Sequence, residues 1–73
     1  MSKNEFVKNV LSALLRECFG EILGASYQKE GKDEVIYINY KDANILKLNI
    51  TGKSKREIVS EAFQAIEFGT EEI

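Results

Sequence analysis

Three basic side chains stand where the last helix of the chain is expected to begin, in the stretch TGKSKREIVSEAFQAIEFG (51–69). Lys53, Lys55 and Arg56 surround Ser54, whose side chain can cap the first turn of that helix. The free N–H groups and the dipole of a helix N-terminus attract anions, so one interpretation is a phosphate-binding site. The other is an ordinary solvated helix start, in which Glu57 offsets the basic charge locally.

Chemistry that depends on titratable side chains has few candidates in this chain. There is no histidine and Cys18 is the only cysteine, which excludes His-based triads, cysteine-rich zinc sites and intrachain disulfides. The apolar spacing puts Cys18 on a core-facing stripe, where a packed thiol is expected rather than a nucleophile. The carboxylates fall in turns, at helix starts and near the C-terminus, where solvent is expected to keep each pKa ordinary. We expect no enzyme activity, no metal and no cofactor.

The composition is that of a small folded domain. The chain has 73 residues, of which 44% are hydrophobic and 30% charged, and a net charge of -2. The stretch 41–56 carries five basic residues against one acid, whereas 57–73 carries only acids. The N-terminus lacks the continuous apolar run of a signal peptide or membrane span, and a lone cysteine fits a reducing cytoplasm. A short reading frame from Met1 is compatible with a mobile-element or accessory protein.

Two helices are predicted from matching signals. Ser2 to Glu5 and Ser54 to Glu57 both fit a capping box, in which a serine and a glutamate three residues later satisfy each other's free N–H groups. Apolar residues then recur every three or four positions, which predicts helices over about 3–19, ending near Gly20 or Gly24, and about 55–68. The polar side of the first helix is expected to carry Lys8, Asn9, Ser12 and Arg16. An acidic tail, 69–73, follows the second.

The segment between the helices predicts three strands, over about 25–30, 34–41 and 45–51, because β-branched and aromatic residues alternate there. A two-residue turn at Gly31-Lys32, with glycine in the first position of a type II′ turn, pairs Tyr27 with Ile36 and Ala25 with Ile38. A three-residue loop, Asp42-Ala43-Asn44, with Asn44 in the left-handed conformation, pairs Ile38 with Leu48 and Ile36 with Ile50.

Because only one face of this sheet is uniformly apolar, both helices are expected to cover that face. The predicted fold is therefore a single α+β domain spanning 1–73, a two-layer α-β-β-β-α sandwich whose three-stranded antiparallel sheet is a meander.

The outer face of the sheet is expected to carry the candidate interface. Its members share an outward position on the two later strands and are apolar or uncharged: Val35, Tyr37, Asn39, Ile45 and Asn49. One interpretation is β-propensity alone, since single apolar residues are common on surfaces. The other is a surface for a protein partner or for self-association, centred on Tyr37. Lys47 and Gln28 on the edge strands are expected to discourage uncontrolled edge pairing.

The order of elements and the stretch Gly52-Lys53-Ser54-Lys55-Arg56 resemble double-stranded RNA-binding domains, in which a basic helix start grips phosphates. The resemblance covers the whole chain in topology and about fifteen residues in motif. Lys55 and Arg56 match the first two basic positions of the family pattern, and Ala62 matches a small packing position. Val59 stands at the third basic position, and the short turn at 31–32 lacks the family's histidine.

The sequence thus predicts a cytoplasmic, non-enzymatic interaction domain that binds a protein or itself, a homodimer included, through the outer sheet face. The alternative is duplex RNA binding through Lys53, Lys55 and Arg56.

Overall fold

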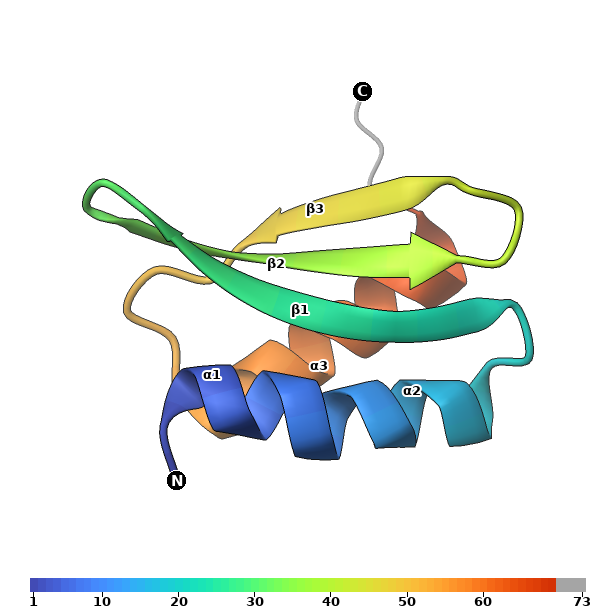
Figure 1. Ribbon diagram of the computed structural model, residues 1–73, viewed down its shortest axis with the longest axis horizontal. Coiled ribbons are helices and arrows are strands. Elements are labelled where there is room, and N and C mark those ends of the chain that lie inside the picture. The colour runs from blue at the N-terminus through green and yellow to red at the C-terminus, as the bar shows by residue number, and fades with distance from the viewer. Residues whose placement is uncertain (70–73) are drawn as a thin grey trace.

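The computed structural model describes residues 1–69, and the predicted tail from residue 70 onward lies outside this range. Its elements follow the predicted order (Figure 1). One helical run comprises α1 (Lys3–Glu5), the π-helical segment η1 (Phe6–Leu11) and α2 (Ser12–Cys18). The strands β1 (Ile22–Glu30), β2 (Asp33–Tyr40) and β3 (Ile45–Asn49) and the helix α3 (Lys55–Phe68) complete the fold.

The predicted α+β fold with an antiparallel meander in the order β1-β2-β3 is confirmed. Figure 1 shows the α1–α2 run alongside β1, and α3 behind the sheet. That both helices cover one face stays a prediction, but the composition of the core supports it. One buried cluster joins side chains of both helices to the inner-face residues of the sheet: Val7, Leu11, Leu15, Ile22, Ala25, Ile36, Ile38, Ile50, Ile58 and Ala62.

Both helix starts are capped as predicted. Glu5 N–H donates to Ser2 Oγ at 3.1 Å, and Ser2 N–H donates to Glu5 Oε1 at 3.2 Å. In the same way Glu57 N–H donates to Ser54 Oγ at 3.2 Å, and Ser54 N–H donates to Glu57 Oε1 at 2.8 Å. Each box satisfies two N–H groups that have no partner inside the helix. At its other end α3 stops at Gly69, whose φ of 77° is open to glycine without strain.

The first helix is wound more loosely than the sequence pattern implied. The N–H of Ser12 donates to the carbonyl of Val7, five residues earlier, which is a π-helical bond. Its wider turn brings residues four apart onto one line, so Val7, Leu11 and Leu15 form the buried row. The neighbouring row is left outside: Val10 is 40% exposed, Leu14 is 37% exposed and Cys18 is also exposed. The prediction that Cys18 packs in the core is therefore wrong.

Ser12, expected on the polar side of the helix, is instead 5% exposed and contacts β1. Its Oγ accepts hydrogen bonds from Ala25 N–H at 2.9 Å and from Arg16 Nη1 at 3.2 Å. A Cβ on Gly24 would lie 2.6 Å from Ser12 Oγ, so only glycine permits this close approach of helix and strand.

β1 begins at Ile22, earlier than predicted, and the register shifts between Ile22 and Gly24, which marks a bulge or irregularity.

The first hairpin has the predicted register, with Tyr27 opposite Ile36 and Ala25 opposite Ile38. Gly31 has a φ of 64°. Among the described residues other than glycine, Ala43 alone has a positive φ, so the φ of Lys32 is negative. Positive φ at the first turn position alone is what a type II′ turn requires.

The register predicted for the second hairpin is wrong by two residues. Ile38 lies opposite Leu46, and Ile36 lies opposite Leu48. The loop is 41–43 because Ala43 N–H closes a turn onto the carbonyl of Tyr40 at 3.1 Å, and Tyr40 N–H donates to Asn44 O at 2.9 Å. A shift of two residues keeps every side chain on its predicted face.

The left-handed residue of this loop is Ala43, with a φ of 76°, and not Asn44. Asn44 is held instead by Asp42, whose carboxylate accepts from the backbone N–H of Asn44 at 3.1 Å and from its side-chain amide at 3.0 Å. Alanine in this conformation costs roughly 1–2 kcal/mol relative to the right-handed region. The hairpin therefore carries local strain at one exposed position.

Ala43→Gly should stabilise the protein by up to about 1 kcal/mol, because the relief of strain exceeds the entropy that glycine adds to the unfolded chain. Urea unfolding followed by circular dichroism measures the effect. Ala13→Gly, at an exposed position of α2, is the matched control and should destabilise by about 1 kcal/mol. Equal destabilisation by both substitutions would contradict the assignment of strain to Ala43.

Candidate functional site

The five residues of the predicted interface lie together on β2 and β3. Val35 is directly opposite Asn49, and Asn39 is directly opposite Ile45. Tyr37 lies between these pairs, opposite Lys47. All five share the face that points away from the inner-face residues Ile36 and Ile38, since side chains alternate along a strand.

Their exposure differs from the prediction. Val35 is only 3% exposed, so it cannot contact a partner. Tyr37 and Asn39 are half-buried, and Asn49 is exposed. Ile45 is the apolar residue of the set that solvent reaches freely, at 63% exposed. The accessible apolar surface is therefore displaced from Tyr37 toward the edge at β3.

A polar cluster of Glu30, Tyr37 and Lys47 crosses this face from β1 to β3. The Tyr37 hydroxyl donates to Glu30 Oε2, and Lys47 Nζ donates to Glu30 Oε1 at 3.1 Å. Lys47 Nζ also lies 5.8 Å from the centre of the Tyr37 ring, within the range of a cation–π contact. The three side chains satisfy one another's charge and hydrogen-bonding capacity.

The pKa shifts within this cluster follow from those bonds. The pKa of Glu30 is lowered, first by the hydrogen bond from Tyr37 and then by that from Lys47. The pKa values of Tyr37 and Lys47 are raised, in each case chiefly by the hydrogen bond to Glu30. All three shifts move away from neutrality, so the cluster holds fixed charges near pH 7 and suits no proton transfer there.

The basic start of α3 is only partly available to an anion. Lys53 Nζ lies 2.9 Å from Glu61 Oε2, and the bond to Glu61 raises the pKa of Lys53. Lys55 and Arg56 are exposed and belong to none of the ion pairs formed within residues 1–69. Val59, at the third basic position of the RNA-binding pattern, is half-buried and packs against the core, while Ala62 is fully buried.

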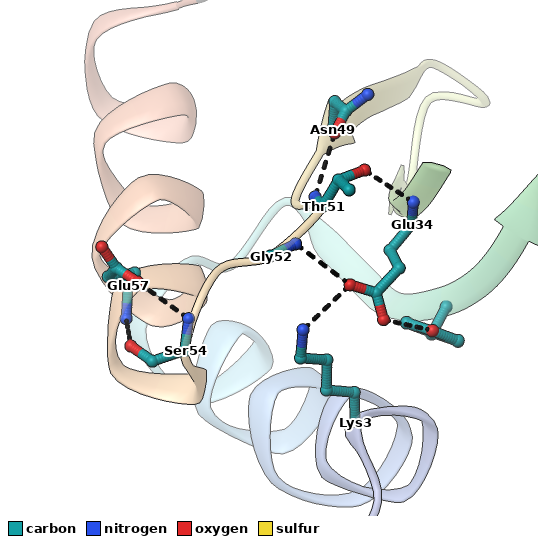
Figure 2. A network of polar contacts seen from close by, with 8 residues as sticks. Lys3, Glu34, Asn49, Thr51, Gly52, Ser54 and Glu57 are labelled. Atoms are coloured by element: carbon teal, nitrogen blue, oxygen red, sulfur yellow. Dashed lines mark hydrogen bonds and ion pairs between the residues drawn. The ribbon is translucent and has the colours of Figure 1, made fainter. Parts of the chain in front are cut away.

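Sequence reasoning missed the network around Glu34, which Figure 2 shows. Its Oε1 accepts from Lys3 Nζ at 2.9 Å and from Gly52 N–H at 3.2 Å, and its Oε2 accepts from the Tyr27 hydroxyl at 2.8 Å. The backbone N–H of Glu34 donates to Thr51 Oγ1 at 2.8 Å. One residue thus joins the first helix, β1 and the segment that leads into α3.

These bonds lower the pKa of Glu34 from 4.5 to about 2, the bond from Lys3 first, then those from Tyr27 and Gly52. The expectation of an ordinary carboxylate is therefore wrong here. The sequence did contain one signal, because the predicted register places this acid in line with Ile36 on the inner face. A charge at such a position needs partners, since leaving water without them is costly.

Pockets and metal-binding clusters are absent from the described residues: residues 1–69 contain neither a pocket nor a group of three or more side chains that could hold a metal ion. None of their helices is long and apolar enough to cross a membrane. Comparison with protein-family models, with curated proteins and with solved structures finds no match to this chain.

Acid should weaken the fold partly through Glu34. Because its pKa is lower in the folded state, the stability it contributes is present above about pH 4.5 and is lost as the pH falls toward 2. Glu34→Gln should lower the urea midpoint at pH 7 and make it depend less on pH between 5 and 2. Glu17→Gln, at an exposed position of α2, is the control and should leave both unchanged. An unaltered pH profile in Glu34→Gln would refute this role.

Proposed function

We propose that this chain is a non-enzymatic interaction domain of the cytoplasm that binds a protein partner, or a second copy of itself, through the outer side of β2 and β3. The observation that carries the proposal is the charge pattern of that face. Among the outward residues of the three strands, Glu30 and Lys47 bind each other, and the outward residues around Tyr37 and Ile45 are otherwise uncharged. The outward acid Asp33 lies at the hairpin end of the face, opposite Glu30.

A surface of this kind suits a protein rather than a charged ligand. Interface centres are depleted of charge and enriched in aromatic and apolar groups, and this face combines exposed Ile45 with a half-buried Tyr37. The Tyr37 ring is held in place by Glu30, so little side-chain entropy remains to be lost when a partner docks. The binding centre is accordingly Ile45 together with the exposed part of Tyr37.

Ile45→Lys should abolish binding while leaving the fold intact, because the side chain is exposed and its replacement puts an unpaired charge into the contact. The measurement compares proteins captured by the wild-type and variant chains, with light scattering of each chain alone. Ser60→Lys adds the same charge at an exposed position of α3, away from this face, and should leave binding unchanged. The proposal would be contradicted if all three chains captured the same proteins and had the same mass in solution.

Duplex RNA binding is the second candidate, supported by the exposure of Lys55 and Arg56 at the start of α3. Since Lys53 is engaged with Glu61, this candidate rests on two side chains and a helix N-terminus. With so few phosphate contacts, the binding of duplex RNA should be weak and should weaken further as the salt concentration rises.

A gel-shift titration of a duplex RNA at low salt tests this candidate. The double variant Lys55→Gln/Arg56→Gln should reduce the affinity at least tenfold, whereas Lys8→Gln/Lys29→Gln removes the same charge elsewhere and should not. No complex at tens of micromolar wild-type protein would end this candidate.

A further inference from the structure

The two outer edges of the sheet are finished differently. On β1 the first helix supplies two partners near the start of the strand: Ser12 Oγ accepts from Ala25 N–H at 2.9 Å, and Arg16 Nη1 donates to Leu23 O at 3.4 Å. Side chains of a neighbouring helix thus cover the start of this edge, which is one of the ways in which natural sheets avoid uncontrolled pairing, whereas the outward groups of Tyr27 and Lys29 receive no hydrogen bond from residues 1–69.

The outward edge of β3 has no such cover within residues 1–69. Tyr40 N–H bonds to Asn44 O, and Ile50 N–H bonds to Glu34 O, which fixes the even-numbered residues of this stretch as those that face β2. Antiparallel pairing alternates between bonded and unbonded positions, so the peptide groups of Ile45, Lys47 and Asn49 point outward. No hydrogen bond from a helix, a loop or a side chain of the described residues reaches these groups.

Lys47 does not protect this edge as its position in the sequence suggested. A lysine on an edge strand normally keeps other strands away by its charge. Here Glu30 on β1 and the Tyr37 ring on β2 hold the ammonium group over the middle of the sheet, with Nζ 3.1 Å from Glu30 Oε1. The charge is both neutralised and drawn back from the open strand.

Apolar side chains continue below the same edge. Leu46 and Leu48 belong to the inner face but are only half-buried, because β3 is the edge strand of the sheet formed by residues 1–69. On α3, the flank that contains Phe63 contacts Phe19, with ring centres 5.2 Å apart. Helical spacing puts Ala65 and Phe68 on the opposite flank, and Phe68 is 80% exposed. The open side is therefore two layers deep, with a strand edge above a helix flank.

We propose that a second copy of this chain pairs with β3, so that two antiparallel β3 strands join the two sheets across a twofold axis. This rests on the proposed self-association, but it places the contact between two copies at the strand edge beside the outer face and not on that face itself. With the axis at Lys47, the outward groups of Ile45 meet those of Asn49 of the second copy. Leu46 then faces Leu48 of the second copy on the inner side.

Two observations favour a second copy as the occupant. The outward groups lie symmetrically about Lys47, and the one like-charge contact that the twofold axis creates is compensated on both sides by Glu30. The side of the molecule that carries the edge measures at most 30 × 20 Å, so the contact buries no more than about 600 Å² per copy. That is the lower end for a specific interface, and it implies a weak dimer that is in exchange with the monomer.

Sedimentation equilibrium between about 10 µM and 1 mM tests the pairing, and should show the mass rising from 8.3 kDa toward twice that value. Ile45→Pro removes an outward N–H at the first position of an edge strand, where proline is tolerated, and should weaken the dimer at least tenfold. Ile45→Thr keeps this N–H and should weaken it less than threefold. Glu30→Gln releases Lys47 toward the edge and should weaken the dimer several-fold.

A mass that stays at 8.3 kDa throughout would overturn the pairing, yet leave binding to another protein through the outer face open. Equal weakening by Ile45→Pro and Ile45→Thr would also overturn it, because the side chain and not the strand edge would then hold the dimer. If neither substitution has an effect on a dimer that forms, the contact lies elsewhere. Circular dichroism of each variant checks that the monomer remains folded.

Discussion

Every peptide group at the edge of a sheet needs a partner, and a three-stranded sheet has only one strand that is not an edge. On the β1 side this requirement affects how the first helix packs against the sheet. A buried N–H left without a partner costs about 1–3 kcal/mol, and the hydroxyl of Ser12 supplies that partner to Ala25. The contact is close enough that position 24 must be glycine. It also fixes how the first helix lies against the sheet.

The π-helical segment is consistent with the same requirement. A regular α-helix would share its buried face between Val7, Val10, Leu11 and Leu14 and would turn Ser12 toward solvent. The wider turn presents the row of Val7, Leu11 and Leu15 to the core and Ser12 to β1. As a result Val10 and Leu14 remain more than a third exposed, and the stability that their full burial would contribute is lost.

Glu34 binds groups at the other end of the core, where the first helix begins and the chain enters α3. Its carboxylate joins Lys3, Tyr27 and Gly52, so the start of the first helix and the approach to α3 are tied to one strand. The outer face repeats this arrangement on a smaller scale with Glu30, Tyr37 and Lys47. In both places one glutamate carboxylate accepts hydrogen bonds from side chains or backbone groups of different helices, strands or loops. On the outer face, this pairs Lys47 with Glu30 and leaves β3 without its protecting lysine.

Local signals in the sequence were enough for the elements, both capping boxes and the first hairpin, because each depends on residues close together in the chain. The second hairpin was misjudged because Ala43 and not Asn44 takes the left-handed conformation, a choice that the Asp42–Asn44 bonds decide. Ser12, Cys18 and Glu34 were misplaced or missed for another reason. Their surroundings are set by contacts between elements, or by a helical winding that periodicity does not reveal. The burial of Val35 likewise required the assembled sheet.

Amide hydrogen exchange in dilute solution tests most directly the claim that the two edges differ. The amide of Ala25, bound to Ser12 Oγ, should exchange as slowly as the amides of Leu46 and Leu48, which face β2. The amides of Ile45 and Lys47 should exchange rapidly, because they face outward and no hydrogen bond within residues 1–69 reaches them. Slow exchange at Ile45 and Lys47 in the monomer, or rapid exchange at Ala25, would contradict the account.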